Sequence, residues 1–308
     1  MTITESAAGH AKPDEPLSAP EPLSWTAPDG LRLAGRVWRP STSGGGVNTR
    51  IPVLCLPGLS RNTRDFDDIA ITLQKAGHVV FAFDYRGRGD SDWDADWRNY
   101  ALPMEEKDID AGINFLGLER FALLGTSRGG LHALAMSYRY PADKMVAVIL
   151  NDIGPHIEMR AIHRIAATLG HNMKAGSIQE IAENQRHMIG HQFPNLTDSD
   201  WEKLARQLAS RPNGGVALDY DPALAHQFAS LDDAAPAPDL WPLFDNLTDR
   251  PVLIIHGENS DLLSGETCRE MLKRHSGAKL HTVQGEGHAP LLWDVASQQA
   301  IRSFLQLV

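Results

Sequence analysis

Cysteine is scarce in this sequence: only Cys55 and Cys268 occur among its 308 residues. Two cysteines in apolar contexts cannot build a disulfide framework or a metal-ligand cluster, so we expect both to be buried, unpaired thiols. Several histidines do fall in one stretch of the chain, namely His163, His171, His187 and His191. Because their spacings match no compact ligand set, the sequence predicts no bound metal and no other cofactor.

Long hydrophobic runs and an excess of basic residues are also missing. The densest apolar stretches, such as residues 145–150, are far shorter than the roughly 20 residues that a membrane-spanning helix needs. With 29 basic and 39 acidic residues, the formal net charge of −10 disfavours nucleic acid and anionic membranes as partners. The first residues lack the basic start and apolar centre of a secretory signal, so we expect a soluble, cytoplasmic protein.

The chain begins with an acidic, proline-rich stretch, residues 1–22, which cannot bury enough apolar surface to become ordered. We predict a flexible tail there. Beyond it, residues 31–38 alternate apolar and polar side chains, the pattern of an antiparallel strand with one solvent-facing side. The glycine-rich residues 41–49 that follow are predicted to form a loop.

Short, wholly apolar runs separated by amphipathic segments make up most of the remaining chain. Buried strands are predicted at residues 51–56, 78–83, 120–124, 145–150, 251–255 and 279–283. Helical patterns fall between or after them, at residues 64–76, 103–117, 128–139, 265–275 and 294–307. This alternation predicts an α/β fold whose mostly parallel sheet is covered by helices on both faces.

One interval interrupts the alternation. Residues 153–245 contain no convincing buried strand but several helical stretches, at about residues 158–169, 177–189, 198–209 and 222–229. An insertion of this size between two core strands is most simply a helical cap over the ends of the strands. The predicted organisation is therefore a core of residues 23–152 and 246–308, with residues 153–245 as the cap.

The strongest local signal is the sequence Gly-Thr-Ser-Arg-Gly-Gly at residues 125–130, which follows a predicted strand and precedes a predicted helix. A Gly-x-Ser-x-Gly motif requires this context, because the sharp turn presents the serine hydroxyl where the strand ends. Gly125 and Gly129 are needed because a Cβ there would collide with the adjacent strand and helix. We therefore predict that Ser127 is a nucleophile.

A base and an acid follow in suitable loops. His288 stands in a glycine-rich loop after the last predicted strand, and Asp261 stands just beyond the strand before it. The order Ser, Asp, His is that of a triad whose members lie on loops at one edge of a sheet. His288 is predicted to remove the proton of Ser127, and Asp261 to orient the imidazole. Asp152, which also follows a predicted strand, is the main competitor for the role of the acid.

These features resemble the α/β-hydrolase superfamily, and in particular its capped lipase- and esterase-like members. The resemblance covers about residues 30–308 and also rests on Leu-Pro-Gly-Leu at residues 56–59 and Asp-Tyr-Arg-Gly-Arg-Gly-Asp-Ser at residues 84–91. It implies an α/β-hydrolase fold, with a mostly parallel central sheet flanked by helices and a helical cap inserted after the sixth strand.

The resemblance also implies an oxyanion hole formed by two backbone N–H groups. Arg128, the residue after the nucleophile, would supply one, and Leu59 in the loop after the third strand would supply the other. Many relatives have His-Gly where this chain has Pro57-Gly58; Pro57 has no N–H, and Ser60 is an alternative donor. We expect the Arg128 side chain to make a structural ion pair.

Together these residues predict a serine hydrolase that cleaves a carboxylic ester or a lactone through an acyl-enzyme intermediate. Hydrolysis of a carbon–carbon bond, or acyl transfer to an acceptor other than water, uses the same triad and stays open as an alternative. A ligand receptor without turnover is a third interpretation, which the intact set of catalytic residue types disfavours. The expected partner is a small-molecule ester or lactone, and the expected assembly is a monomer or a homodimer.

Overall fold

The structure is a computed structural model that describes residues 18–40, 50–171, 174–210, 215–229 and 238–308. An eight-stranded sheet forms its centre, in the order β1-β2-β4-β3-β5-β6-β10-β11. These strands are β1 (Glu21–Thr26), β2 (Arg32–Trp38), β3 (Val53–Leu56), β4 (Val80–Asp84), β5 (Phe121–Thr126), β6 (Met145–Asn151), β10 (Val252–Gly257) and β11 (Lys279–Val283). Within this sheet only β1 with β2 and β2 with β4 pair antiparallel, so the mostly parallel sheet predicted from the apolar runs is confirmed.

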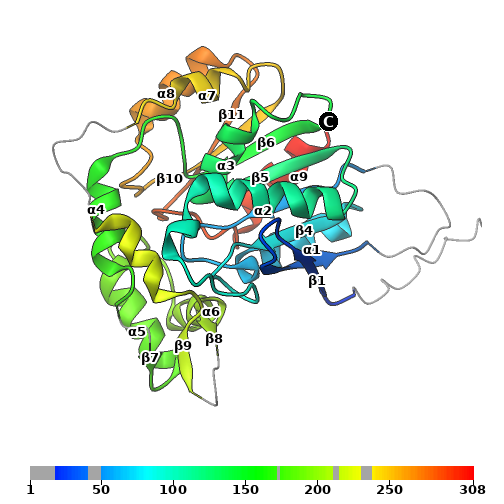
Figure 1. The fold of residues 1–308 in the computed structure, drawn as a ribbon. Coiled ribbons are helices and arrows are strands. Elements are labelled where there is room, and N and C mark those ends of the chain that lie inside the picture. The colour runs from blue at the N-terminus through cyan, green and yellow to red at the C-terminus, as the bar shows by residue number, and fades with distance from the viewer. Residues whose placement is uncertain (1–17, 41–49, 172–173, 211–214, 230–237) are drawn as a thin grey trace, which may run out of the picture.

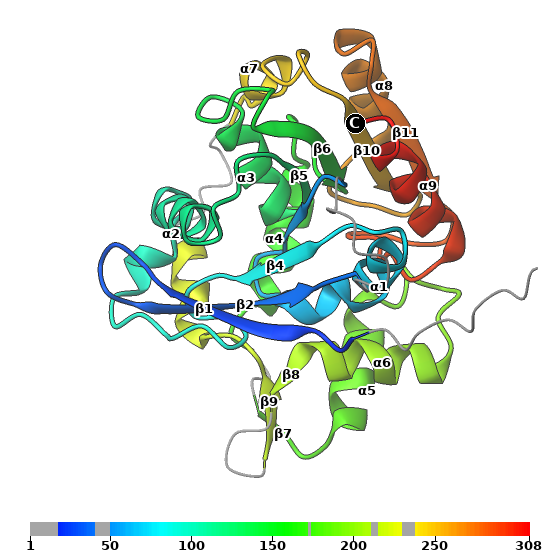
Figure 2. The ribbon, with the colours of Figure 1, turned by 90° about the vertical axis from the view of Figure 1, so that its right-hand side faces the viewer.

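Helices cover both faces of the sheet, and Figure 2 shows α2 and α9 on opposite sides of it. One face carries α1 (Asp67–Lys75) and α9 (Val295–Leu305); the other carries α2 (Leu102–Phe115), α3 (Arg128–Met136) and α8 (Gly265–Arg274). Successive side chains of a strand point to opposite faces, so in β5 Phe121 and Leu123 join one apolar layer while Ala122 and Leu124 join the other. Within the described ranges, no helix is both long and apolar enough to cross a lipid bilayer.

Strand β1 is not among the predicted elements. Residues 1–17 of the predicted tail lie outside the described residues, as does the predicted loop at residues 41–49, but Glu21 already pairs with Val37 of β2. Only Trp25 of β1 is buried, because β1 is an edge strand with one neighbour. An edge strand of this kind has no continuous apolar run that would distinguish it from a tail.

Between β6 and β10 the chain leaves the sheet and forms a layer beyond one edge of it (Figure 1). The elements of this layer are α4 (Met159–Thr168), α5 (Ile178–Ile189), α6 (Asp198–Leu208), a 3-10 helix (Pro222–Phe228) and a small sheet of β7 (Lys174–Ala175), β8 (Ala209–Ser210) and β9 (Val216–Leu218). The sequence does not predict the small sheet, because its strands are too short to show a period. α7 (Trp241–Asp245), at the end of the same insertion, packs against α3, where Phe244 is fully buried.

Candidate active site

A sharp turn joins β5 to α3 and carries Ser127. The backbone of Ser127 has φ +50°, a conformation that residues other than glycine rarely adopt and that the surrounding packing must hold in place. A Cβ on Gly125 would lie 2.3 Å from the carbonyl oxygen of Gly129, and a Cβ on Gly129 would lie 2.1 Å from that of Leu56. The two glycines are therefore required by close backbone approach, as the motif predicts.

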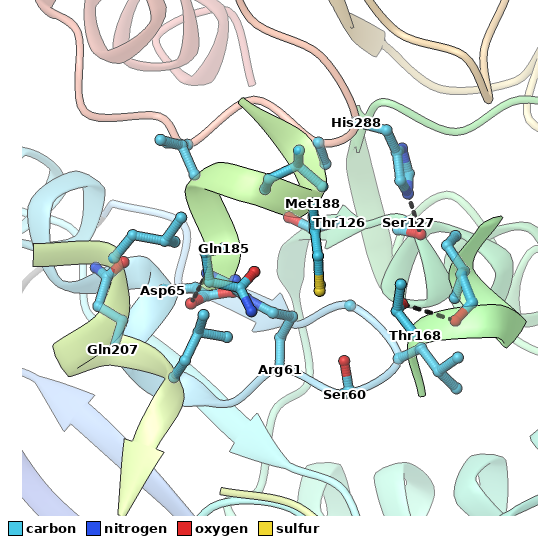
Figure 3. A pocket seen from close by; sticks show the side chains of 18 of the residues that line it. Ser60, Arg61, Asp65, Thr126, Ser127, Thr168, Gln185, Met188, Gln207 and His288 are labelled. Carbon is cyan, nitrogen blue, oxygen red and sulfur yellow. Dashed lines mark hydrogen bonds and ion pairs between the residues drawn. The ribbon is translucent and has the colours of Figure 1, made fainter. Parts of the chain in front are cut away.

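The structure brings Ser127 and His288 together, as Figure 3 shows. The Oγ of Ser127 lies 2.9 Å from the Nε2 of His288. On the other side of the imidazole, Nδ1 lies 2.8 Å from the Oδ2 of Asp152. The carboxylate, the imidazole and the hydroxyl therefore form one continuous hydrogen-bonded relay.

The carboxylate in this relay is not the predicted one. Asp261 is turned to Arg164 of α4, whose Nε and Nη2 lie 2.6 and 2.7 Å from its two oxygens. Burial alone would raise the pKa of Asp261, but the ion pair with Arg164 keeps it below its ordinary value. The assignment of the acid to Asp261 is therefore wrong in this structure, and the competing candidate Asp152 lies against His288. Asp152 directly follows β6, which is the neighbour of β5, so its carboxylate lies close to the turn at Ser127.

Asp152 is held in place by several contacts of its buried carboxylate. The backbone N–H of Gly257 donates to Oδ1 at 2.9 Å, and the hydroxyl of Ser260 donates to Oδ2 at 2.6 Å. The Nδ1 of His256 lies 3.5 Å from Oδ1. Burial alone would raise the pKa of Asp152, but the contacts with His256 and His288 hold it below its ordinary value. The carboxylate is therefore ionised near neutral pH, and it can accept a hydrogen bond from an N–H at Nδ1 of His288.

Gln192, a residue of the insertion, supports the loop that carries His288, and the sequence motifs do not predict this role. The Oε1 of Gln192 accepts a hydrogen bond from the backbone N–H of His288 at 2.8 Å. Asn259 donates in turn to the backbone carbonyl of Gln192 at 3.0 Å. A Cβ on Gly287 would lie 2.3 Å from Oε1 of Gln192, so the loop and the glutamine fit closely. No motif marks Gln192, since its contact depends on how the insertion folds back on the core.

The two predicted oxyanion donors lie at the same edge of the sheet. Arg128 is the first residue of α3, and the N–H groups of the first helical turn have no partner within the helix. Leu59 and Ser60 line the cavity beside Ser127, and the carbonyl oxygen of Leu59 accepts a hydrogen bond from Nε of Arg88 at 2.8 Å. Arg88 thereby fixes the peptide that follows Leu59. The role of these N–H groups remains a prediction.

The side chain of Arg128 makes the expected structural ion pair. Its Nε lies 2.6 Å from Glu105, and its Nη2 donates to the carbonyl oxygen of Tyr100 at 2.7 Å. Arg88 and His132 also contact Glu105, at 2.9 and 3.0 Å. Burial alone would raise the pKa of Glu105, but Arg128 and Arg88 hold it well below its ordinary value. This buried cluster anchors the start of α3.

Comparison with known proteins decides the family. Residues 51–295 match the family model described as the alpha/beta hydrolase fold. The chain belongs to the α/β-hydrolase family.

Similar proteins include several other hydrolases. This α/β hydrolase is 34% identical to a 3-hydroxybutyrate-oligomer hydrolase from Cupriavidus necator over 88% of this chain and 92% of that one. It is 26% identical to a 2-(acetamidomethylene)succinate hydrolase from Mesorhizobium japonicum over 77% and 81% of the two chains. The crystal structure of an alpha/beta hydrolase from Novosphingobium aromaticivorans matches with a TM-score of 0.86 and 36% identity, covering 94% of this chain and 99% of that one.

The cavity of this hydrolase lies between the sheet edge and the layer of α4 to α6, and its volume is about 200 Å³. Ser127 and His288 line it from the core side. Most of its wall on the other side is apolar, with Ile165, Leu169, Ile181, Met188 and Phe193 among the residues that line it. The hydroxyl of the relay therefore faces a largely apolar space, which is typical of a small-molecule site.

Cys55 and Cys268 lie outside this cavity and are buried and unpaired, as predicted. Across the part of the chain that the structure describes, no three His, Cys, Asp or Glu side chains are grouped so that they would hold a metal ion.

Proposed function

We propose that this hydrolase cleaves carboxylic esters with Ser127 as nucleophile, His288 as general base and Asp152 as the residue that orients the base. The observation that carries the proposal is the relay, in which 2.9 Å separates Ser127 Oγ from His288 Nε2 and 2.8 Å separates His288 Nδ1 from Asp152 Oδ2. A nucleophile within hydrogen-bond reach of a base, which a third group orients, is the arrangement that activates serine.

In the first half-reaction His288 Nε2 takes the proton of Ser127 as Oγ bonds to the ester carbonyl carbon. The negative charge moves to the carbonyl oxygen, where backbone N–H groups of Leu59 and Arg128 would stabilise it. When the carbonyl reforms, the bond to the alcohol oxygen breaks and His288 donates its proton to that oxygen. Water then attacks the acyl-enzyme with the same base, releasing the acid and restoring Ser127.

For the substrate we propose an ester of a hydroxyalkanoic acid, such as a short linear oligomer. The support is the 34% identity to a 3-hydroxybutyrate-oligomer hydrolase along nearly the whole of both chains. Carbon–carbon bond hydrolysis and acyl transfer would use the same relay, so the preference for an ester rests on this relative. A lactone is a cyclic ester and would follow the same chemistry.

The experiment is turnover of the linear dimer of 3-hydroxybutanoate and of short-chain aryl esters by the purified protein. We expect Ser127→Ala to reduce kcat by at least about 10³-fold, because the nucleophile is lost. Ser60→Ala is the matched control, since it removes a cavity hydroxyl but keeps the backbone N–H. Mass spectrometry after a serine-reactive fluorophosphonate should place the label on Ser127. Absence of turnover of every ester by the wild type, or undiminished turnover by Ser127→Ala, contradicts the proposal.

A further inference from the structure

Two guanidinium groups line the cavity of this acidic protein. The chain has a formal net charge of −10, yet the charged groups lining the cavity, counted over the described residues with histidine neutral, are Arg61, Arg164 and Asp65. Each guanidinium already has a carboxylate beside it, because Asp65 pairs with Arg61 and Asp261 pairs with Arg164. A largely apolar cavity whose lining includes two guanidinium groups offers charged hydrogen-bond donors to a substrate that carries an anionic group.

We propose that the substrate ester carries a free carboxylate and that Arg61 binds it. This inference rests on the proposed ester hydrolysis and specifies the substrate of the same site. A linear hydroxyalkanoate dimer has such a group on the hydroxyacid that leaves when the ester is cleaved.

Arg61 lies close to the nucleophile. A Cβ built on Gly58 would be 3.1 Å from Cγ of Arg61 and 3.9 Å from Cβ of Ser127, so the base of the Arg61 side chain is beside the turn that carries Ser127. Figure 3 shows the side chains of Arg61 and Asp65 within the pocket, on one side of the Ser127 hydroxyl. A carboxylate held there would be a few bonds from the ester carbonyl.

Asp65 fixes the orientation of Arg61 without using all of its donors. The Nε and Nη2 of Arg61 lie 2.7 Å from the two carboxylate oxygens of Asp65. A guanidinium has five N–H donors in a planar fork, so this pairing takes one edge and leaves Nη1 and the second N–H of Nη2 for another acceptor. The amides of Asn184 and Gln185 of α5 also line the cavity and add neutral donors. A guanidinium whose orientation is already fixed binds a second carboxylate with less loss of side-chain freedom.

Arg164 has a different task. Its bidentate pair with Asp261 joins α4 of the insertion to a loop of the core, so it holds two separate elements together. The Arg61–Asp65 pair links residues four apart on one core segment. The Arg61 guanidinium therefore does not serve to join two separate elements of the fold. Binding of a substrate carboxylate does explain its presence.

The test compares a free-acid dimer of 3-hydroxybutanoate with its methyl ester, which has the same internal ester but no carboxylate. The measured quantity is the ratio of the kcat/KM values for the two substrates. We expect the wild type to prefer the free acid and Arg61→Gln to lower the ratio by about 10- to 100-fold, the effect of a lost charged hydrogen bond. The exposed Arg186 of α5 provides the matched control, and Arg186→Gln should keep the ratio.

Two further variants separate substrate binding from a structural role of the ion pair. Asp65→Asn weakens the pair but keeps the guanidinium, so the ratio should fall by much less than in Arg61→Gln. The double variant Arg61→Gln/Asp65→Asn keeps the charge of the cavity but lacks the guanidinium, so the ratio should stay low. Equal loss in Asp65→Asn and Arg61→Gln, or a wild-type ratio in the double variant, would overturn the role of Arg61. If the wild type uses both substrates equally, the proposal that the substrate carries a free carboxylate is overturned, while ester hydrolysis is not. If the wild type turns over neither substrate, ester hydrolysis itself is contradicted.

Discussion

Asp152 and His288 lie 2.8 Å apart, between Oδ2 and Nδ1, although 136 residues separate them along the chain. From this contact we expect Asp152→Asn to lower kcat by about 10⁴-fold, because an amide favours the wrong imidazole tautomer. The matched variant is Asp261→Asn, which weakens the ion pair with Arg164 and should lower kcat by less than about 10-fold. Steady-state kinetics on one aryl ester gives both values. The reverse order of the two losses would return the acid to Asp261.

The contact of Gln192 with the backbone of His288 leads to a second expectation. Gln192→Ala removes the acceptor at 2.8 Å, and the loss of one hydrogen bond should lower kcat by about 2- to 10-fold. Gln192→Glu keeps an acceptor and should lose less. Exposed Gln179 on α5 is the control, and Gln179→Ala should behave as the wild type. Wild-type kcat in Gln192→Ala would show that the loop needs no support from the insertion.

The sharp turn that carries Ser127 gives a stability expectation. Gly129→Ala places a Cβ 2.1 Å from the carbonyl oxygen of Leu56, so the backbone must shift and unfolding should become easier by about 1–3 kcal/mol or more. Gly265→Ala is the control, because the nearest atom to its Cβ is a side-chain nitrogen of Arg269 at 3.7 Å. Thermal unfolding should show a lower Tm for Gly129→Ala and an unchanged or higher Tm for Gly265→Ala. Similar Tm values for the two variants would argue against the tight turn.

Glu286, two residues before His288, gives a pH expectation. Burial raises the pKa of Glu286 to about 7, so the folded protein binds a proton there that the unfolded chain has lost above its ordinary pKa of 4.5. This contribution to stability is therefore present below about pH 4.5 and is lost as pH rises toward 7. Glu286→Gln keeps an acceptor for the N–H of Leu291. Between pH 5 and 8 its Tm should therefore fall by less than the Tm of the wild type. Exposed Glu119 serves as control, and a wild-type pH slope in Glu286→Gln contradicts the expectation.

The sequence determines some parts of the site more firmly than others. Ser127 could be located because its motif demands a strand, two small residues and a helix in fixed order, and all are local. The acid could not be chosen this way, since Asp152 and Asp261 both follow strands that end at the same sheet edge. Which aspartate lies against His288 depends on two sets of contacts. Arg164 of the insertion forms an ion pair with Asp261, and the end of β10 and the loop after it hold Asp152. Neither contact leaves a pattern in the sequence.

The fold shows the same division. The parallel strands inside the sheet match their apolar runs closely. β11 falls at Lys279–Val283 as predicted, but it is not the buried strand that the sequence predicts, because it is an edge strand in which only Val283 is buried. Strand β1 and the small sheet of β7, β8 and β9 are missed, because an exposed edge strand and strands of two or three residues show neither a continuous apolar run nor a period. α7 falls in the predicted cap range, yet Phe244 packs it onto the core, a choice that only tertiary packing makes.

The hydrogen bond from His288 to Gln192 has a consequence for engineering this enzyme. Exchanging the segment over the cavity for that of another family member is an obvious way to change substrate range. Here such a chimera would lose the amide that supports the backbone of His288, and we expect its rate to fall even for substrates that fit the new cavity. A graft that retains Gln192 and its neighbours would separate the two effects.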